Sequence, residues 1–157
     1  WDAIGVAAAA QEQYQRNARP ELRFLRLLCS AVTSGECHIA DADGERPNNQ
    51  KIASANGWRR KRLLSGTHWE AMGSRIGWID GDDLFLDPSS SFKTAQEMAR
   101  HGERIPVGEK TLHKRMADSG LLASTEQGRG KLTVRKELEG KRRSVLHVKS
   151  GTLCQEE

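Results

Sequence analysis

The sequence predicts an α+β protein, and three observations lead to that class. Apolar residues recur at helical spacing in several segments of the 157-residue chain, whereas short alternating segments flank Gly-containing turns. Apolar residues make up 36% and charged residues 29%, enough for a buried core beneath a well-hydrated surface. No apolar run approaches the ~18 residues of a membrane-spanning helix. We therefore expect no membrane partner and a cytoplasmic location.

The first 75 residues predict a mostly helical region with one short strand. Pro20 suits the first turn of a helix, and the leucines that follow it form an apolar face between arginines. Asn56-Gly57 is a good helix stop, and the basic run Trp58–Arg62 comes directly after it. The expected elements are helices at 2–17, 20–34 and 48–55, a strand at 37–40, and a polar loop from the end of the basic run to residue 74.

A hairpin and a helix are predicted next. Arg75–Ile79 and Leu84–Leu86 flank an Asp-Gly turn, which is a strong signal for two paired strands. Pro88 and three serines then favour the start of a helix, which we place from about Ser90 to His101.

A second helix and a second hairpin complete the pattern. The helix runs from Glu109 to about Ser119 and is stopped by Gly120. An alternating strand at 131–136 then turns through Gly140 into a partner strand at 142–149. Two helices with a short connection, followed by a basic hairpin, indicate a winged helix-turn-helix module. We assign it to residues 76–150, with 151–157 as a tail, and leave open that residues 1–75 form a second, divergent winged helix.

Positive charge is concentrated in this module. The chain carries a net charge of +4, yet residues 1–100 hold 13 Lys/Arg and 13 Asp/Glu, whereas residues 101–150 hold 12 Lys/Arg and 6 Asp/Glu. Such asymmetry indicates a polyanionic partner. In a helix-turn-helix the second helix enters the major groove of DNA, and a basic wing reaches phosphates. The nucleic-acid-binding residues that we predict are Lys110, Thr111, His113, Lys114 and Arg115 on the helix and Arg129, Lys131, Arg135, Lys136, Lys141, Arg142 and Arg143 on the wing.

The stretches VGEKTLHKRMADSGLLAST (107–125) and GRGKLTVRKELEGKRRSVLHV (128–148) resemble the C-terminal region of phage- and plasmid-type primase/helicase-like ATPases. RIGWIDGDDLFLDP (75–88) is similar to the hairpin before that module, with a looser similarity at 21–41. The resemblance implies a winged helix, DNA as the ligand, and a role in replication or mobile elements. Because the chain opens on Trp1, we expect it to be part of a longer parent chain, which could itself be an ATPase or primase.

Other functions remain to be weighed. The basic helix could pair internally, with Lys114 and Arg115 near Glu109 and Asp118, and serve a protein–protein adaptor or regulatory domain without DNA contact. The sequence has no GxxxxGK[ST] loop, HExxH or GxSxG, so we expect no catalytic site, metal or cofactor.

Three residue types complete this reading. The aspartates at 80, 82, 83 and 87 could suggest a two-metal nuclease, but local turn hydrogen bonding accounts for them better. The three cysteines, with no CxxC pair, predict reduced thiols. Of the four tryptophans, Trp58 alone has a basic setting suited to stacking on bases, and core burial is equally consistent there.

Overall fold

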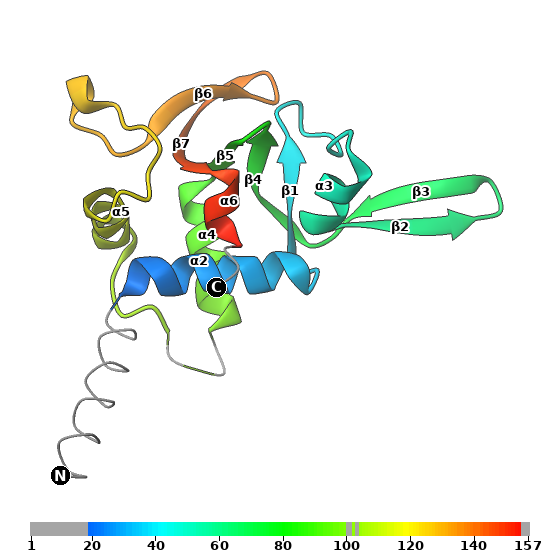
Figure 1. Cartoon of the computed structure of the whole chain (residues 1–157), viewed down its shortest axis with the longest axis horizontal. Coiled ribbons are helices and arrows are strands. Elements are labelled where there is room, and N and C mark those ends of the chain that lie inside the picture. The colour runs from blue at the N-terminus through cyan, green and yellow to red at the C-terminus, as the bar shows by residue number, and fades with distance from the viewer. Residues whose placement is uncertain (1–18, 100–101, 103, 155–157) are drawn as a thin grey trace, which may run out of the picture.

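The computed structural model describes residues 19–99, 102 and 104–154, so Trp1 and the helix expected at 2–17 lie outside the described residues. The mixed α+β class is confirmed, with a five-stranded and a two-stranded sheet (Figure 1). The helices are α2 (Pro20–Thr33), α3 (Gln50–Ala55), α4 (Pro88–Met98), α5 (Glu109–Asp118) and α6 (Ser150–Leu153), with a 3-10 turn at Gln127–Arg129. The strands are β1 (Cys37–Asp41), β2 (Trp58–Leu63), β3 (Gly66–Ala71), β4 (Ser74–Asp80), β5 (Asp83–Leu86), β6 (Val134–Leu138) and β7 (Lys141–Lys149).

The five-stranded sheet has the order β1-β4-β5-β7-β6. β1 runs parallel to β4, and every other neighbouring pair is antiparallel. The expected hairpin at 75–86 is present as β4 and β5, and its turn contains Gly81 with φ +63°. The boundary that we predicted between residues 75 and 76 falls inside β4, so one sheet spans both predicted regions.

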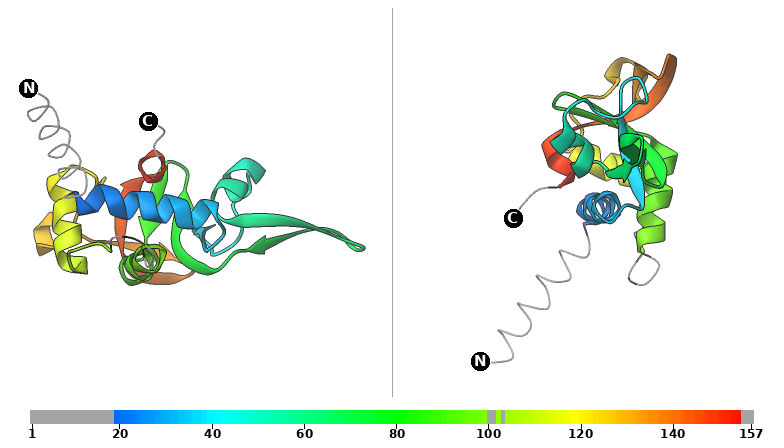
Figure 2. Two further views of the ribbon diagram at one scale, coloured as in Figure 1. Left: turned by 90° about the horizontal axis from the view of Figure 1, so that it is seen from below. Right: turned by 90° about the vertical axis from the view of Figure 1, so that its right-hand side faces the viewer.

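Most of the core lies where helices cover one face of this sheet. Phe24 and Leu28 of α2 pack in one cluster with Leu112 and Met116 of α5 and with Leu146 of β7. Helix α2 contacts α4, α5 and α6, as the second view in Figure 2 also shows for α2 and α6. The first helix of the chain's described part therefore shares its core with the C-terminal module.

The opposite face of the sheet carries a smaller cluster. Trp78, Phe85, Leu138 and Val145 are buried there, with Ala40. Neighbours along a strand point to opposite faces, so Phe85 belongs to this cluster while Leu84 and Leu86 belong to the main core. Trp78 is 0% exposed.

Helix starts follow local capping rules. The Asn49 side chain accepts hydrogen bonds from the backbone N–H groups of Lys51 and Ile52 and begins α3. The Asp87 side chain accepts from the N–H of Ser90 at 2.9 Å, so α4 begins at Pro88 rather than at Ser90 and ends at Met98. Both helices predicted for these segments are present.

The strands of the C-terminal hairpin begin and end at different residues from those expected. β6 begins at Val134 rather than at residue 131, because the segment before it folds as a 3-10 turn whose end is fixed by Glu126. The backbone N–H of Lys131 bonds to the Glu126 carbonyl, and the Glu126 carboxylate accepts from the N–H of Arg135 at 2.8 Å. Glu139 and Gly140 both have positive φ, which is the geometry of a tight two-residue hairpin turn.

The polar loop expected up to residue 74 is wrong. β2 and β3 pair antiparallel from Trp58↔Ala71 to Leu63↔Gly66. Gly57 (φ +85°) makes the entry, and a Cβ on it would lie 2.3 Å from the carbonyl oxygen of Cys37. The basic run that follows has no alternation of apolar and polar residues, which is why the period-2 signal of a strand is missing.

The expectation of three reduced thiols is also wrong. Cys29 of α2 and Cys154 after α6 form a disulfide, with their Cα atoms 5.4 Å apart. Their sequence separation is 125, and no local pattern relates residues so far apart. Cys37 remains a buried thiol, and burial, with a smaller effect of the Glu36 charge, raises its pKa to about 12.

Reduction of this disulfide should destabilise the fold. A cross-link that closes so long a loop restricts the unfolded chain and contributes ~2–4 kcal/mol to the free energy of unfolding. Urea denaturation with and without a thiol reductant measures the difference. A Cys154→Ser variant should unfold at the same urea midpoint as the reduced wild type, and adding the reductant should not change that midpoint. Equal midpoints for oxidised and reduced wild type would show that the cross-link adds no stability.

Candidate nucleic-acid interface

Helix α5 has one buried and one exposed face. Leu112 and Met116 are buried in the main core. Four of the predicted contact residues of α5, Lys110, Thr111, Lys114 and Arg115, are exposed. The Ser119 hydroxyl donates to the buried Glu21 carboxylate at 3.1 Å, which fixes the end of α5 against α2. The rotation of α5 about its axis is therefore set by contacts at both its middle and its end.

The cations of α5 are not neutralised within the helix. Among the described residues, no carboxylate lies within ion-pair distance of Lys110, Lys114 or Arg115. Lys114 and Arg115 do not form the ion pairs with Glu109 and Asp118 that an adaptor role would favour. The outer face of α5 thus presents three positive charges to solvent.

His113 lies on a different face from these cations. It is only 9% exposed, and its Nε2 atom is buried without a hydrogen-bond partner. Burial lowers the pKa of its imidazole, opposed by the nearby Glu109 carboxylate. A buried neutral ring of this kind packs rather than contacts a phosphate.

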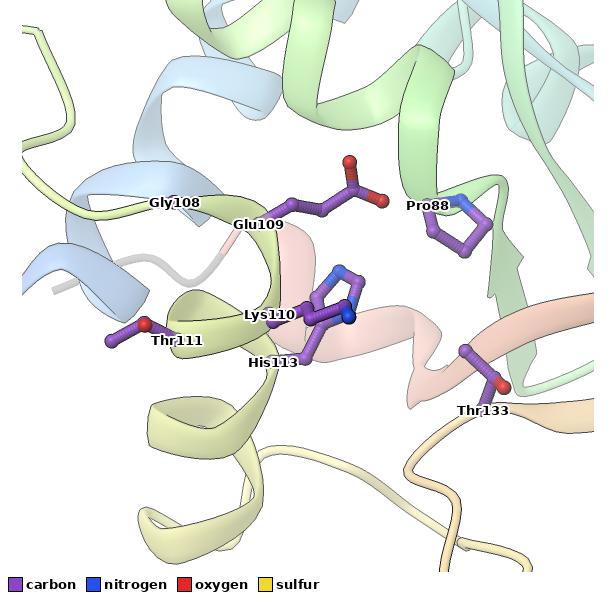
Figure 3. Close-up of a pocket in the computed structure, with 7 residues that line it drawn as sticks. All are labelled: Pro88, Gly108, Glu109, Lys110, Thr111, His113 and Thr133. Carbon is purple, nitrogen blue, oxygen red and sulfur yellow. The ribbon is translucent and has the colours of Figure 1, made fainter.

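A shallow cavity of about 590 Å³ opens beside His113. Figure 3 shows Glu109, Lys110 and His113 extending from α5 towards Pro88 and Thr133, with Thr111 pointing away from them. The backbone at Gly108 begins the helix without a side-chain cap. One lysine and one glutamate flank this cavity, so their charges oppose each other there.

Four of the seven predicted wing cations are exposed and make no ion pair with any described residue. Lys141 and Arg142 follow the hairpin turn, and Arg135 lies on β6. Lys131 lies in the connection before β6. In Figure 1, α5 and this connection lie at one end of the molecule, next to β6. These four side chains remain available to a partner.

Arg143 is instead part of a cluster around Glu139. Its guanidinium pairs with Glu139 at 3.6 Å, and Arg75 pairs with the same carboxylate. The Trp78 indole N–H donates to Glu139 at 3.0 Å, and the two guanidinium groups lie 4.6 and 5.1 Å from the Trp78 ring. The N–H of Glu139 donates to the Ala42 carbonyl at 2.8 Å. The hairpin turn is thereby tied to the sheet.

Two further wing cations have partners within the protein. The Lys136 ammonium lies 5.4 Å from the centre of the Phe85 ring, and Arg129 pairs with Glu126 at 3.6 Å. Lys136, Arg129 and Arg143 were predicted on the same grounds as the other four. Phe85 and Trp78 lie on other strands, and residue spacing does not reveal these contacts. Glu126 and Glu139 lie only three and four residues before Arg129 and Arg143.

The aspartates at 80–87 act separately. Asp87 caps α4, and Asp83 accepts from His147 at 2.8 Å and from Lys149 at 3.0 Å. Those hydrogen bonds, the His147 one foremost, lower the pKa of the Asp83 carboxyl. Within the part of the chain that the structure describes, no three His, Cys, Asp or Glu side chains converge on a position that could hold a metal ion.

One constellation was missed by the sequence reasoning. The Ser124 hydroxyl lies 2.6 Å from His147 Nδ1, and Nε2 of the same ring lies 2.8 Å from Asp83. An ionised Asp83 favours the tautomer with hydrogen on Nε2, so Nδ1 accepts from Ser124. The ring orientation is the reverse of that in serine hydrolases, where Nε2 faces the nucleophile. The pairing of Ser124 with His147 in a β-bridge makes the set a tether between the segment after α5 and strands β5 and β7.

The other missed feature is the β2–β3 ribbon. Trp58 stands at its root, where its indole N–H donates to the Ile39 carbonyl at 2.9 Å and its ring meets His38 edge-on at 5.2 Å. Trp58 is therefore an anchor rather than a free stacking platform. Four of the chain's cations, at 59–62, follow it along an exposed strand.

Comparison with protein-family models, with curated proteins and with solved structures returns no match. None of the described helices is both long enough and apolar enough to cross a bilayer.

His113 makes folding stability depend on pH. Its folded-state pKa is lowered, so as pH falls below ~6.5 the unfolded chain takes up a proton that the folded chain does not. The free energy of unfolding should fall from pH 7 until the folded pKa is passed. A His113→Leu variant, with His68→Leu as an exposed control, should lose this decline in chemical denaturation at stepwise pH. An unchanged profile for His113→Leu would exclude this histidine as the cause.

Proposed function

We propose that the protein binds DNA through α5 and the basic residues of the β6–β7 hairpin, in a winged-helix arrangement. The observation that carries the proposal is the outer face of α5, where Lys110, Lys114 and Arg115 are exposed without acidic partners. A helix with a buried apolar face and a free cationic face suits the negatively charged groove of DNA.

The chain order supports the winged-helix arrangement. β5 is followed by α4, α5 and the β6–β7 hairpin, and β7 inserts between β5 and β6. Helix α2 packs on α4 and α5 as the third helix of such a module. The β1, α3, β2–β3 and β4 elements are then additions between its first helix, α2, and its first strand, β5. The module would start at α2 rather than at residue 76.

The proposed contacts are narrower than those expected from the sequence. They comprise Lys110, Thr111, Lys114 and Arg115 on α5 and Lys131, Arg135, Lys141 and Arg142 near the hairpin. Arg129, Lys136 and Arg143 support the fold through internal partners. We further propose that the module is a non-catalytic DNA-binding part of a replication or mobile-element protein of the primase/helicase-like type, on the resemblance of residues 75–148.

Binding to DNA should depend steeply on salt. If roughly six of these cations engage phosphates, affinity should fall ~10³-fold between ~50 and ~200 mM salt. Fluorescence anisotropy with a labelled mixed-sequence duplex, and with the matching single strand, gives the slope and the strand preference. A Lys114→Glu/Arg142→Glu double variant should bind at least ~10-fold more weakly, with a salt slope reduced by about 2.

The matched control is Lys51→Glu/Lys93→Glu, which changes the net charge equally at exposed lysines of α3 and α4. This control should keep most of the affinity if the contacts are local. An equal loss in both double variants would mean that only the net charge matters. No binding at low salt, with the fold intact by circular dichroism, would overturn the proposal in favour of a protein–protein adaptor role.

A further inference from the structure

The β2–β3 ribbon projects from the body of the protein. Figures 1 and 2 show the two strands extending well beyond the sheet, at the end of the molecule opposite α5. Each strand has six residues, which span roughly 20 Å at ~3.4 Å per residue. Nearly all side chains along both strands are exposed or half-buried. Apart from the pairing of its two strands, the ribbon is contacted by α3 at β2 and by Arg46 at Trp69.

Several hydrogen bonds hold the root of the ribbon against the body of the protein. Besides the Trp58 anchor, the Arg59 guanidinium donates to the Ser34 carbonyl at 3.4 Å. On the returning strand, the N–H of Met72 donates to the Gly57 carbonyl at 3.0 Å, and His38 Nδ1 lies 3.0 Å from the Met72 carbonyl. Both strands are thus tied to the end of α2 and to β1.

The two faces of the ribbon differ in charge. Directly paired residues share a face, so Arg60 and Trp69 lie together, as do Arg62 and Thr67. The Arg46 guanidinium lies 4.8 Å from the centre of the Trp69 ring and adds a third cation. Among the described residues, no carboxylate pairs with these three arginines. We call this set, Arg46, Arg60, Arg62, Thr67 and Trp69, the arginine face.

The other face is partly neutralised. Lys61 forms an ion pair with Glu70, and Arg59 is held at the root. Arginine, with its planar fork of donors, is the side chain best matched to phosphate oxygens. Arg46 is held by the Pro47 carbonyl and the Trp69 ring, whereas Arg60 and Arg62 form no ion pair with any described residue. Arg60 and Arg62 therefore make the arginine face the more suitable of the two for a polyanion.

The tip of the ribbon is apolar. Leu63 is 54% exposed and Leu64 is 112% exposed, and with Ile52 they are the large hydrophobic side chains most exposed among the described residues. Removing an exposed leucine from water is favourable, so this tip favours a partner that offers an apolar environment. Leucine is among the side chains that wedge between base pairs from the minor groove.

We propose that the β2–β3 ribbon is a second DNA-binding element, which follows the minor groove of a duplex with its arginine face and inserts Leu64 between base pairs. The proposal rests on the ribbon's own residues and does not require that α5 bind DNA. Arginines are attracted to a narrow minor groove, and an apolar wedge unstacks a base step and kinks the duplex. The chemistry of the partner is thus a duplex that can bend, without a requirement for base-specific hydrogen bonds.

A duplex fits this ribbon better than an anionic lipid surface. Arg60 and Arg62 lie two residues apart on one face of β2, a separation of about 7 Å at ~3.4 Å per residue, behind an apolar tip. A duplex can contact both arginines along the ribbon, whereas a bilayer would be met first by the tip. Trp69 lies beside Arg60 in the middle of the ribbon, away from the depth that a bilayer interface would reach. Because the ribbon and α5 are at opposite ends, one duplex that contacts both must run along the molecule.

Two ribbon variants test the arginine contacts and the leucine insertion separately. In Arg60→Gln/Arg62→Gln, the slope of log affinity against log salt for a mixed-sequence duplex should fall by about 2. The matched control, Arg59→Gln/Lys61→Gln, removes two charges from the same strand on the other face and should change the slope by less than half as much. In Leu63→Ser/Leu64→Ser, low-salt affinity should stay within ~3-fold, while bending should be lost.

Bending is measured by energy transfer between fluorophores at the two duplex ends, using the full chain. Ile52→Ser, an exposed hydrophobic residue on α3, is the control for the tip variant. Reduced slope in the arginine variant together with lost bending in the tip variant supports the proposal. Wild-type slope and bending in both ribbon variants overturns it.

Two further outcomes separate this proposal from the proposed function. If Lys114→Glu/Arg142→Glu loses DNA binding while the ribbon variants behave as wild type, the α5 interface is supported and the ribbon proposal is rejected. If the ribbon variants lose slope and bending while Lys114→Glu/Arg142→Glu binds as wild type, the ribbon proposal is supported and the α5 interface is rejected. Absence of any wild-type DNA binding overturns both. Ribbon-dependent binding to phosphatidylserine vesicles without ribbon-dependent DNA binding would overturn the DNA assignment in favour of a membrane surface.

Discussion

Strands β5 and β7 pair at the centre of the five-stranded sheet, where Leu84 faces Val148 and Leu86 faces Leu146. All four side chains are buried in the main core. Without this pairing the sheet would separate into β1-β4-β5 and β7-β6, because among the described strands no other hydrogen-bonded pairing joins the two parts. Since α4 and α5 lie between β5 and β6 in the chain, closing this pair confines both helices to the space beneath the sheet. The Cys29–Cys154 disulfide joins α2, the first described helix, to the residue that follows α6, the last one.

The exposed cations of α5 follow from that confinement. Once Leu112, His113 and Met116 are buried and Ser119 is bonded to Glu21, Lys110, Lys114 and Arg115 are left on the exposed side of the helix. The hairpin turn is constrained differently, since Glu139 draws Arg75 and Arg143 onto the Trp78 ring. A helix held by its apolar side and a turn held by an ion cluster leave Lys114 and Arg142 free at defined places.

Sequence reasoning located the elements that local rules control. The α2 and α5 helices and the β4–β5 hairpin follow from residues within a few positions of each other. The α3 and α4 helices were expected on the same basis, but their capping residues, Asn49 and Asp87, were not identified. Sequence reasoning failed where distant residues decide the outcome. The Cys29–Cys154 disulfide, the contact of Arg143 with the Trp78 ring and the Ser124–His147–Asp83 tether each join segments that no spacing rule relates. The β2–β3 ribbon failed for a local reason, because a strand exposed on both faces carries no hydrophobic alternation.

Charge shows the same limit in its sharpest form. Residues 1–100 carry equal numbers of acidic and basic side chains, so a sum along the sequence assigns no polyanion to that segment. In space these charges separate. The acidic residues Asp80 and Asp82 lie at the β4–β5 turn, whereas Arg60 and Arg62 lie together on a ribbon that projects from the body. A potential falls off within about 10 Å at moderate ionic strength, so an approaching polyanion meets the local surface and not the average of the segment. Electrostatic recognition is therefore decided by the face of a folded element. For this reason, a segment whose charges sum to zero can still contain a strongly basic face.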